Sequence, residues 1–357
     1  MNNKLVTILL LAILSFCSSK KNNFEISYDV DTKNNSNNEL LNKYSLLNIN
    51  NKIVNKKDLL IQIKKIKQFS PKLYKKNKKL YQSINVWLKS DGNITKLKLF
   101  GIHLHRLKNL NHYGNIKITS YYTPIIHARK KLEKEFRYPI YTVPDYLSKR
   151  KRLPSRKEIY NGMLQKKYII AYSNSLIDNF IMDIQGSGII NYGTHKPLVV
   201  FKYAGENGWP YTSIGKILIN HGDIKKENMS MQAIKNWSKR HTQLEVKKLL
   251  ENNNSFVFFK PMKYKLICGA NSIPLIAKTS IAADKNIIKP GSIVLAKIPI
   301  LNKIGKFTNA YETRLLVALD VGGSIKGQKL DLYQGIGEKS GIMAGFYNHY
   351  GYIWILK

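Results

Sequence analysis

The feature that most constrains the fold of this chain is a succession of short β-rich runs that begins after residue 116. Runs such as 168–172, 197–201 and 255–259 are rich in β-branched and aromatic residues, and Gly, Pro and Asn lie between them. Many short strands with turn residues between them are typical of barrels, and not of a parallel sheet with crossover helices. The sequence therefore predicts a mainly β protein whose strands form barrels.

Helical spacing is found in the remaining parts of the chain. Between residues 59 and 88 apolar residues recur at helical intervals, and Pro71 divides the stretch into two helices, with Ser70 as the N-cap of the second. Two more helical stretches, 213–220 and 230–250, interrupt the β-rich part, and the second begins with a capping serine, Ser230. We expect N-terminal helices to precede a β-rich body.

The N-terminus has the features of an export sequence. A short apolar run, 5–13, is too short to span a bilayer, and it is followed by Leu-Ser-Phe-Cys, which resembles the site where a lipoprotein is lipidated on its cysteine. Phe16 departs from the small residue preferred before the cut, so a plain signal and an uncleaved anchor remain open. We predict a lipoprotein-type signal over residues 1–17 with Cys17 lipidated, and a tether rich in Asn, Lys and Ser over residues 18–56.

The net charge of +37 admits two interpretations. A polyanionic partner such as nucleic acid would explain it. However, only eight of the 59 basic residues are Arg, and a selected phosphate site would be expected to use more of them. We favour compositional drift toward Lys, and the export sequence argues against a nucleic-acid partner.

Acidic residues are scarce in the last 96 residues, and two of them follow a suggestive layout. Asp320 ends the apolar run 315–319, which we expect to be a strand buried on both faces. A Gly-Gly turn follows, and the chain then returns to Asp331, so both carboxylates should lie near one rim. Two like charges in a partly desolvated site raise one pKa, as a general acid near neutral pH requires. The alternative is that both aspartates only cap turns.

Other chemistries have no support in the sequence. The Gly-Gly turn with Lys326 lacks the glycine spacing and the Lys-Ser/Thr pair of a nucleotide-binding loop. HExxH, paired CxxC and clustered histidines are all absent from the sequence. We therefore predict neither a metal nor an organic cofactor.

Several motifs together resemble one known family. They are Tyr-Tyr-Thr-Pro at 121–124, Tyr-Pro-Ile-Tyr at 138–141, Arg-Leu-Pro-Ser-Arg at 152–156, Gln-Gly-Ser-Gly at 185–188, Tyr-Ala-Gly at 203–205 with Asn207 and Tyr211, and the segment from Asp320 to Asp331. Over nearly all of residues 57–357 the chain resembles the membrane-bound lytic murein transglycosylase A family, although Ser324 stands where the family usually has Ala. The last segment resembles a module named for three aspartates, which here correspond to Asp284, Asp320 and Asp331.

The resemblance implies a double-psi β-barrel domain and a second, inserted β-domain, with a groove between them for a glycan. A chain of 357 residues is long enough for about two such domains. We assign residues 57–123 and 262–357 to the barrel and residues 124–261 to the insertion.

The resemblance also implies the reaction, which is the cleavage of the β-1,4 bond between N-acetylmuramic acid and N-acetylglucosamine in peptidoglycan. The resemblance implies an exolytic enzyme. It would be a lyase, because the C6 hydroxyl of muramic acid attacks its own C1 and forms a 1,6-anhydro sugar without water. Asp331 would act first as acid and then as base, and Asp320 and Asp284 would order the site. One acid suffices, since the substrate carries its own nucleophile.

The binding residues and partners follow from the same resemblance. The substrate contacts it implies are Tyr121, Tyr122, Gln185, Ser187, Asn207, Tyr211 and Lys326; rings suit sugar faces, and amides suit hydroxyls. The expected partners are glycan strands, the outer membrane through the lipid, and cell-wall synthesis proteins, at the periplasmic face of that membrane. The alternative is a non-catalytic peptidoglycan-binding lipoprotein.

Overall fold

The computed structural model describes residues 28–29, 52–145, 152–262 and 266–357. The predicted signal, Cys17 and most of the predicted tether lie outside these residues. No helix in the described ranges is both long enough and apolar enough to cross a bilayer.

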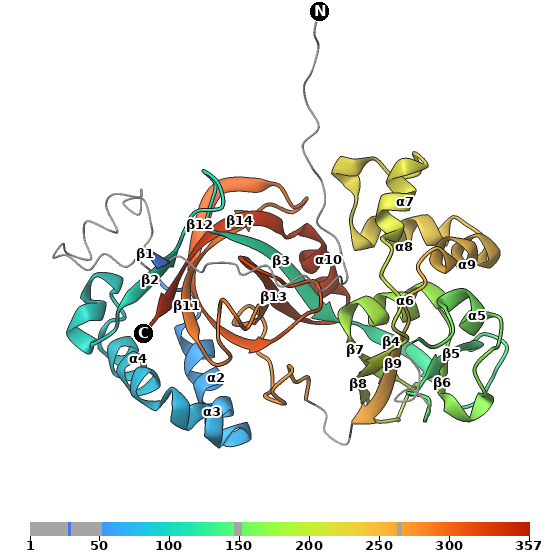
Figure 1. Cartoon of the computed structure of the whole chain (residues 1–357), viewed down its shortest axis with the longest axis horizontal. Coiled ribbons are helices and arrows are strands. Elements are labelled where there is room, and N and C mark those ends of the chain that lie inside the picture. Colours follow the sequence, from blue (N-terminus) through green and yellow to red (C-terminus); the bar gives the residue numbers. More distant parts are fainter. Residues whose placement is uncertain (1–27, 30–51, 146–151, 263–265) are drawn as a thin grey trace, which may run out of the picture.

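The larger sheet closes into a six-stranded barrel (Figure 1). Its order is β14-β11-β12-β10-β13-β3, and a further pairing of β14 with β3 completes the ring. Two neighbouring pairs are parallel, β10 with β12 and β13 with β3. The two strands β1 (Tyr28–Asp29) and β2 (Leu104–Leu107) extend the sheet beside β14. The barrel strands are β3 (Ile116–Thr123), β10 (Ser280–Ala283), β11 (Ile293–Leu301), β12 (Phe307–Asp320), β13 (Lys329–Ile336) and β14 (Asn348–Leu356).

Strand β12 is buried on both faces, as its continuous apolar run predicted. Leu316 and Ala318 point into the barrel interior with Ile118 and Leu330. Leu315, Val317 and Leu319 point outward and pack against the N-terminal helices. Because side chains alternate along a strand, only a run without polar residues can satisfy two cores at once.

The N-terminal helices α2 (Lys56–Phe69), α3 (Pro71–Lys76) and α4 (Lys78–Ser90) cover one side of the barrel, and a 3-10 helix, Ile94–Phe100, follows them (Figure 1). Pro71 divides the helical stretch as predicted, since its ring fits the first turn of a helix. Ser70 occupies the N-cap position, but its side chain makes no capping hydrogen bond. The predicted second helix is in fact two, because the chain breaks again at Asn77.

The second sheet has the order β5-β6-β4-β7-β8-β9 and belongs to a domain inserted between β3 and β10. Its strands are β4 (Ile125–Arg129), β5 (Tyr138–Tyr141), β6 (Ile169–Ser173), β7 (Ser187–Asn191), β8 (Val199–Glu206) and β9 (Val257–Met262). Its helices are α5 (Arg156–Tyr160), α6 (Leu176–Gln185), α7 (Ile214–Asn220), α8 (Met231–Lys239) and α9 (Gln243–Glu251), with short 3-10 helices at Lys166–Tyr168 and Lys226–Asn228. Figure 1 shows the barrel and this domain side by side.

The predicted helix over 230–250 is two helices with separate caps. The Ser230 side chain accepts a hydrogen bond from the Ala233 amide, which confirms it as the N-cap of α8. Thr242 and Glu245 then form a capping box that begins α9. The fold class is confirmed: a mainly β protein with N-terminal helices, a barrel and an inserted β-domain.

Candidate active site

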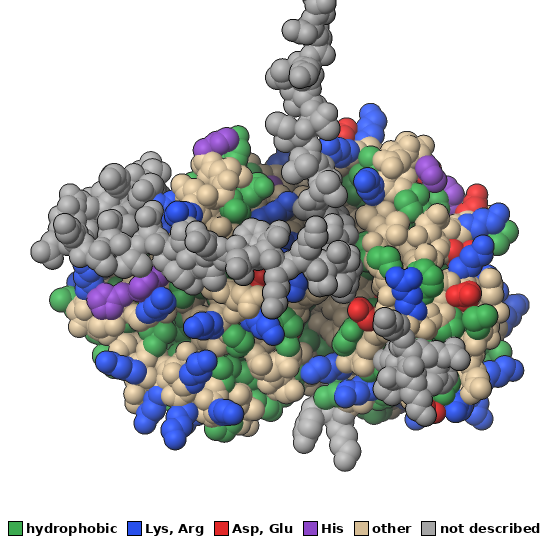
Figure 2. Space-filling model, viewed as in Figure 1, with side chains coloured by type: hydrophobic (Ala, Val, Ile, Leu, Met, Phe, Trp, Pro, Cys, Tyr) green, Lys and Arg blue, Asp and Glu red, His purple; other side chains and the backbone are tan. Residues whose placement is uncertain are grey.

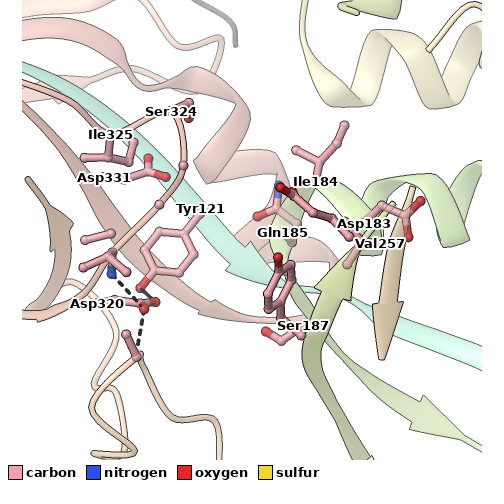
Figure 3. Close-up of a pocket in the computed structure, with 18 of the residues that line it drawn as sticks. Tyr121, Asp183, Ile184, Gln185, Ser187, Val257, Asp320, Ser324, Ile325 and Asp331 are labelled. Atoms are coloured by element: carbon pink, nitrogen blue, oxygen red, sulfur yellow. Dashed lines mark hydrogen bonds between the residues drawn. The ribbon is translucent and has the colours of Figure 1, made fainter. Parts of the chain in front are cut away.

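A pocket of about 460 Å³ lies between the barrel and the inserted domain. Its volume falls within the range of roughly 300–1,000 Å³ typical of ligand sites. Tyr121, Asp320 and Asp331 line it from the barrel, and Gln185 and Ser187 line it from the facing domain (Figure 3). The predicted groove between the two domains is therefore present.

Asp331 lies on β13 with its carboxyl group at the pocket wall. Leu330 and Leu332 on either side of it are buried in the barrel, so alternation directs Asp331 outward. The Thr119 hydroxyl donates a hydrogen bond of 2.7 Å to its Oδ1. Burial raises the pKa of Asp331 from 3.8 to about 6; the Thr119 bond and the Lys329 charge oppose this rise, and the Asp320 charge adds to it. With a pKa of about 6, the carboxyl group is half protonated near pH 6, and about one molecule in ten still carries the proton at pH 7.

Asp320 ends β12 and is fixed by three donors (Figure 3). The Tyr121 hydroxyl donates to its Oδ2 at 2.9 Å, and the amides of Val321 and Ala270 donate to its Oδ1 at 2.9 Å each. Burial raises the pKa of Asp320, while these three bonds lower it. All three donors favour the charged form and so limit this rise.

A small residue separates the two carboxylates. Ala282 of β10 is in register with Asp320 on one side and with Asp331 on the other. The two aspartates therefore start from strands two spacings apart, roughly 10 Å between backbones. Ala282 itself lines the pocket, and its methyl group leaves the space between the carboxylates open.

Asp284 lies outside the lining of this pocket. Its Oδ2 accepts a hydrogen bond of 2.9 Å from the Gly327 amide, and its Oδ1 accepts one of 3.0 Å from the Asn286 amide. Gly327 has a φ of +62°, a conformation that favours glycine. Asp284 thus fastens the end of the 321–327 loop, part of which lines the pocket with Asp331, and we propose an ordering role for it.

The predicted sugar contacts separate into two groups. Tyr121, Gln185, Ser187 and Tyr211 line the pocket. The Gln185 Oε1 accepts a hydrogen bond of 2.9 Å from the backbone amide of Tyr122, which orients the side chain amide.

Tyr122, Asn207 and Lys326 are not brought to the pocket wall. The Tyr122 ring packs in a hydrophobic cluster with helices of the inserted domain. Asn207 is fully buried; it donates to the carbonyls of Pro154 and Asn254 and accepts from the Phe256 amide. Lys326 is exposed on the 321–327 loop. In place of the predicted sugar contacts, we propose structural roles for Tyr122 and Asn207.

Comparisons with known proteins agree with this geometry. A family model described as the MltA specific insert domain matches residues 117–260, and a 3D domain model matches residues 279–357. A membrane-bound lytic murein transglycosylase A homolog of Buchnera aphidicola subsp. Schizaphis graminum is 56% identical over 311 residues, which is 87% of this chain and 85% of the relative. This chain belongs to the membrane-bound lytic murein transglycosylase A family.

Escherichia coli provides two further members of the family. The membrane-bound lytic murein transglycosylase A of strain K12 is 52% identical over 300 residues, 84% of this chain and 81% of the relative. A crystal structure of E. coli MltA with bound chitohexaose matches with a TM-score of 0.83 and 49% identity, over 87% of this chain and 93% of that one.

The sequence did not reveal an ion pair that lines the pocket of this protein. Arg156 Nη2 lies 2.9 Å from Asp183 Oδ2, and both side chains are almost fully buried. Arg156 also donates to the carbonyls of Asn253 and Ser255 and to the Tyr160 hydroxyl. Burial raises the pKa of Asp183 to about 7, and the arginine opposes this rise. Arg156 was visible in the sequence as the last residue of the Arg-Leu-Pro-Ser-Arg motif, but its partner Asp183 had no distinguishing context.

Basic side chains do not gather into one stripe on the face shown in Figure 2. Lys and Arg are scattered over both halves of that face, and Asp and Glu are sparse. A nucleic-acid site would be expected to concentrate the charge along one groove or element. The distribution favours drift toward Lys.

Proposed function

We propose that this chain is a lytic transglycosylase that cleaves the β-1,4 bond between N-acetylmuramic acid and N-acetylglucosamine in peptidoglycan. The observation that carries the proposal is Asp331, a carboxyl group with a pKa of about 6 at the wall of an interdomain pocket. General acids work best when their pKa lies near the working pH. Membership of the family supports the same reaction, since the named relatives are lytic murein transglycosylases.

The reaction needs one acid that later acts as a base. Protonated Asp331 donates to the bridging oxygen, and the bond from this oxygen to the muramyl C1 breaks. The C6 hydroxyl of the same sugar then bonds to C1, and its proton returns to the Asp331 carboxylate. Water takes no part, so the product ends in a 1,6-anhydro ring, and the enzyme is left in its starting protonation state.

The Asp320 anion supports this cycle from the other side of Ala282. Positive charge develops at the sugar C1 as the leaving oxygen departs, and a fixed anion nearby stabilises it. The Tyr121 hydroxyl and two backbone amides hold Asp320 in place, so it does not need to reorient during the reaction. The facing side chains of Gln185, Ser187 and Tyr211 are proposed to bind sugar hydroxyls.

The finer class and location of the enzyme are also part of the proposal. We propose exolytic action, a lipid anchor on Cys17 and residence at the periplasmic face of the outer membrane. The apolar run and the lipobox-like residues before Cys17 support the anchor, as do the relatives named membrane-bound. Contacts with cell-wall synthesis proteins remain a prediction of the family resemblance.

The test is a digest of purified sacculi, with the products identified by mass spectrometry. We expect soluble muropeptides that end in 1,6-anhydromuramic acid, and ends with a reducing muramic acid would show a hydrolase instead. Asp331→Asn should abolish release, while the matched surface variant Asp91→Asn should keep it. Binding to sacculi with no soluble product from the unsubstituted protein would favour the non-catalytic alternative.

A further inference from the structure

Two lysines lie side by side on the outer wall of the barrel, next to Thr119 and Asp331. In the parallel pairing of β13 with β3, Lys329 is in register with Lys117, and Asp331 is in register with Thr119. Leu330, which lies between Lys329 and Asp331, and Ile118, which lies between Lys117 and Thr119, are both buried in the barrel. Because side chains alternate along a strand, both lysines point to the same face as Thr119 and Asp331, two residues before them in the chain.

This lysine pair, Lys117 and Lys329, has no carboxylate at ion-pair distance among the described residues. Lys329 Nζ donates to the Ser324 carbonyl at 3.4 Å, and Lys117 Nζ lies 5.9 Å from the centre of the Tyr350 ring. Tyr350 is the register partner of Lys117 in β14, so its ring flanks the pair.

The lysine pair is electrostatically unfavourable as it stands. Both side chains are partly buried, and burial lowers the pKa of each, although the Asp331 charge opposes this lowering at Lys329. The Lys329 charge lowers the pKa of Lys117 further. Two partly desolvated cations that repel each other gain free energy when an anion binds between them. The pair lies just outside the lining of the pocket, two residues along the strands from Thr119 and Asp331, and this part of the wall is suited to an anionic group that projects from a bound substrate.

The substrate of the proposed function has such a group at the expected place. Asp331 must reach the oxygen on C1 of muramic acid, so the muramyl ring lies next to this wall. Muramic acid differs from glucosamine by a lactyl ether at O3, whose carboxyl group is either free or joined to a peptide that carries carboxylates of its own. N-Acetylglucosamine has no charged group.

We propose that Lys117 and Lys329 bind the carboxylate borne by the lactyl substituent of the muramyl residue, and so select muramic acid over N-acetylglucosamine at the cleavage point. This inference rests on the proposed function, because it assumes that Asp331 acts at the muramyl C1. The bound carboxylate is that of the lactyl group itself or one on the attached peptide.

Three glycan substrates separate these sources. The first is a glycan strand with intact peptides. The second is a strand from which an amidase has removed the peptides, which leaves the lactyl carboxylates free. The third is the second strand after its lactyl carboxylates have been converted to neutral methylamides. We compare the unsubstituted protein with the double variant Lys117→Gln/Lys329→Gln. The double variant should raise KM about tenfold on the charged substrate that the pair recognises, the size expected for a lost charged hydrogen bond, and leave KM on the neutral strands unchanged. An effect on the first substrate alone identifies a peptide carboxylate, and an effect on the second identifies the lactyl carboxylate.

Matched variants control for charge and for folding. Lys303→Gln/Lys306→Gln removes two exposed lysines from the β11–β12 turn and should leave KM unchanged on all three substrates. Lys117→Arg/Lys329→Arg keeps both charges and should keep the discrimination between charged and neutral strands. The inhibition constant of neutral chitohexaose should be the same for the double Gln variant and the unsubstituted protein. The single variant Lys117→Gln, which leaves Lys329 in place beside Asp331, should give a smaller rise of the same kind if the double variant does not fold.

Two results would overturn the inference. One is an equal rise in KM on charged and neutral strands, and the other is no rise on any. Failure of the proposed function has a different signature, since the unsubstituted protein would then release no anhydro product from any strand. Lys329→Gln should also move the alkaline limb of the kcat profile to higher pH on all substrates alike, because the lysine charge lowers the pKa of Asp331.

Discussion

The raised pKa of Asp331 has a cost in stability that can be measured. The folded protein holds the carboxyl proton more tightly than the unfolded chain does, with a pKa of about 6 against 3.8. The free energy of unfolding therefore falls as pH rises through this window, and the whole penalty is present above about pH 6. At 1.36 kcal/mol per pKa unit, the ionised carboxylate destabilises the fold by about 3 kcal/mol at neutral pH.

Asp331→Asn removes this penalty. Asn has nearly the same shape, and its amide oxygen can still accept the Thr119 hydrogen bond. We expect the variant to be inactive and more stable by about 3 kcal/mol near pH 7, and to match the unsubstituted protein near pH 4. Active sites commonly trade stability for function in this way.

Denaturant unfolding at the two pH values gives the measurement, provided that the m-values of the two proteins agree. Asp91→Asn is the matched control, because the pKa of Asp91 is lowered in the folded protein whereas that of Asp331 is raised. The hydrogen bond from Lys96 lowers the pKa of Asp91, so loss of that carboxylate should not stabilise the protein at neutral pH. A gain for Asp331→Asn that is equal at both pH values, or no gain near pH 7, would refute the assignment of a raised pKa.

Three further predictions concern the neighbours of Asp331 and the core of the inserted domain. Thr119→Val removes a hydrogen bond that favours the carboxylate, so the alkaline limb of the kcat/KM profile should move up by about one pH unit, while Thr119→Ser should leave it in place. Asp320→Asn removes a charge that raises the pKa of Asp331, so the same limb should move to lower pH; an upward movement would contradict the coupling. Asn207→Ala should lower the free energy of unfolding by roughly 2–4 kcal/mol, because the Pro154 carbonyl and the Phe256 amide lose their partner and the Asn254 carbonyl keeps only the Arg156 amide. Its KM for glycan strands, measured well below the unfolding temperature, should stay unchanged; a large rise in KM would restore Asn207 as a sugar contact.

Local patterns in the sequence determined the elements and one rim of the site. The apolar run of β12 carried enough information to predict a strand buried on both faces, and Pro71 to predict a break between helices. The strand, the Gly-Gly turn and the return to Asp331 placed two carboxylates near one another. These inferences succeeded because burial pattern, helix breaking and turn formation depend on residues close together in the chain.

Which neighbours meet across the site was decided only by the tertiary structure. Alternation allows one of Tyr121 and Tyr122 to face the pocket, and the pairing of β3 with β13 selects Tyr121. The same pairing brings Thr119 to Asp331, 212 positions away in the sequence. Strand alternation is a local property, whereas register depends on the closure of the whole barrel, and a shift by one residue would exchange the two faces. The sequence alone therefore determined that two carboxyl groups lie near one rim, and the closed barrel decided which donors, cations and rings surround them.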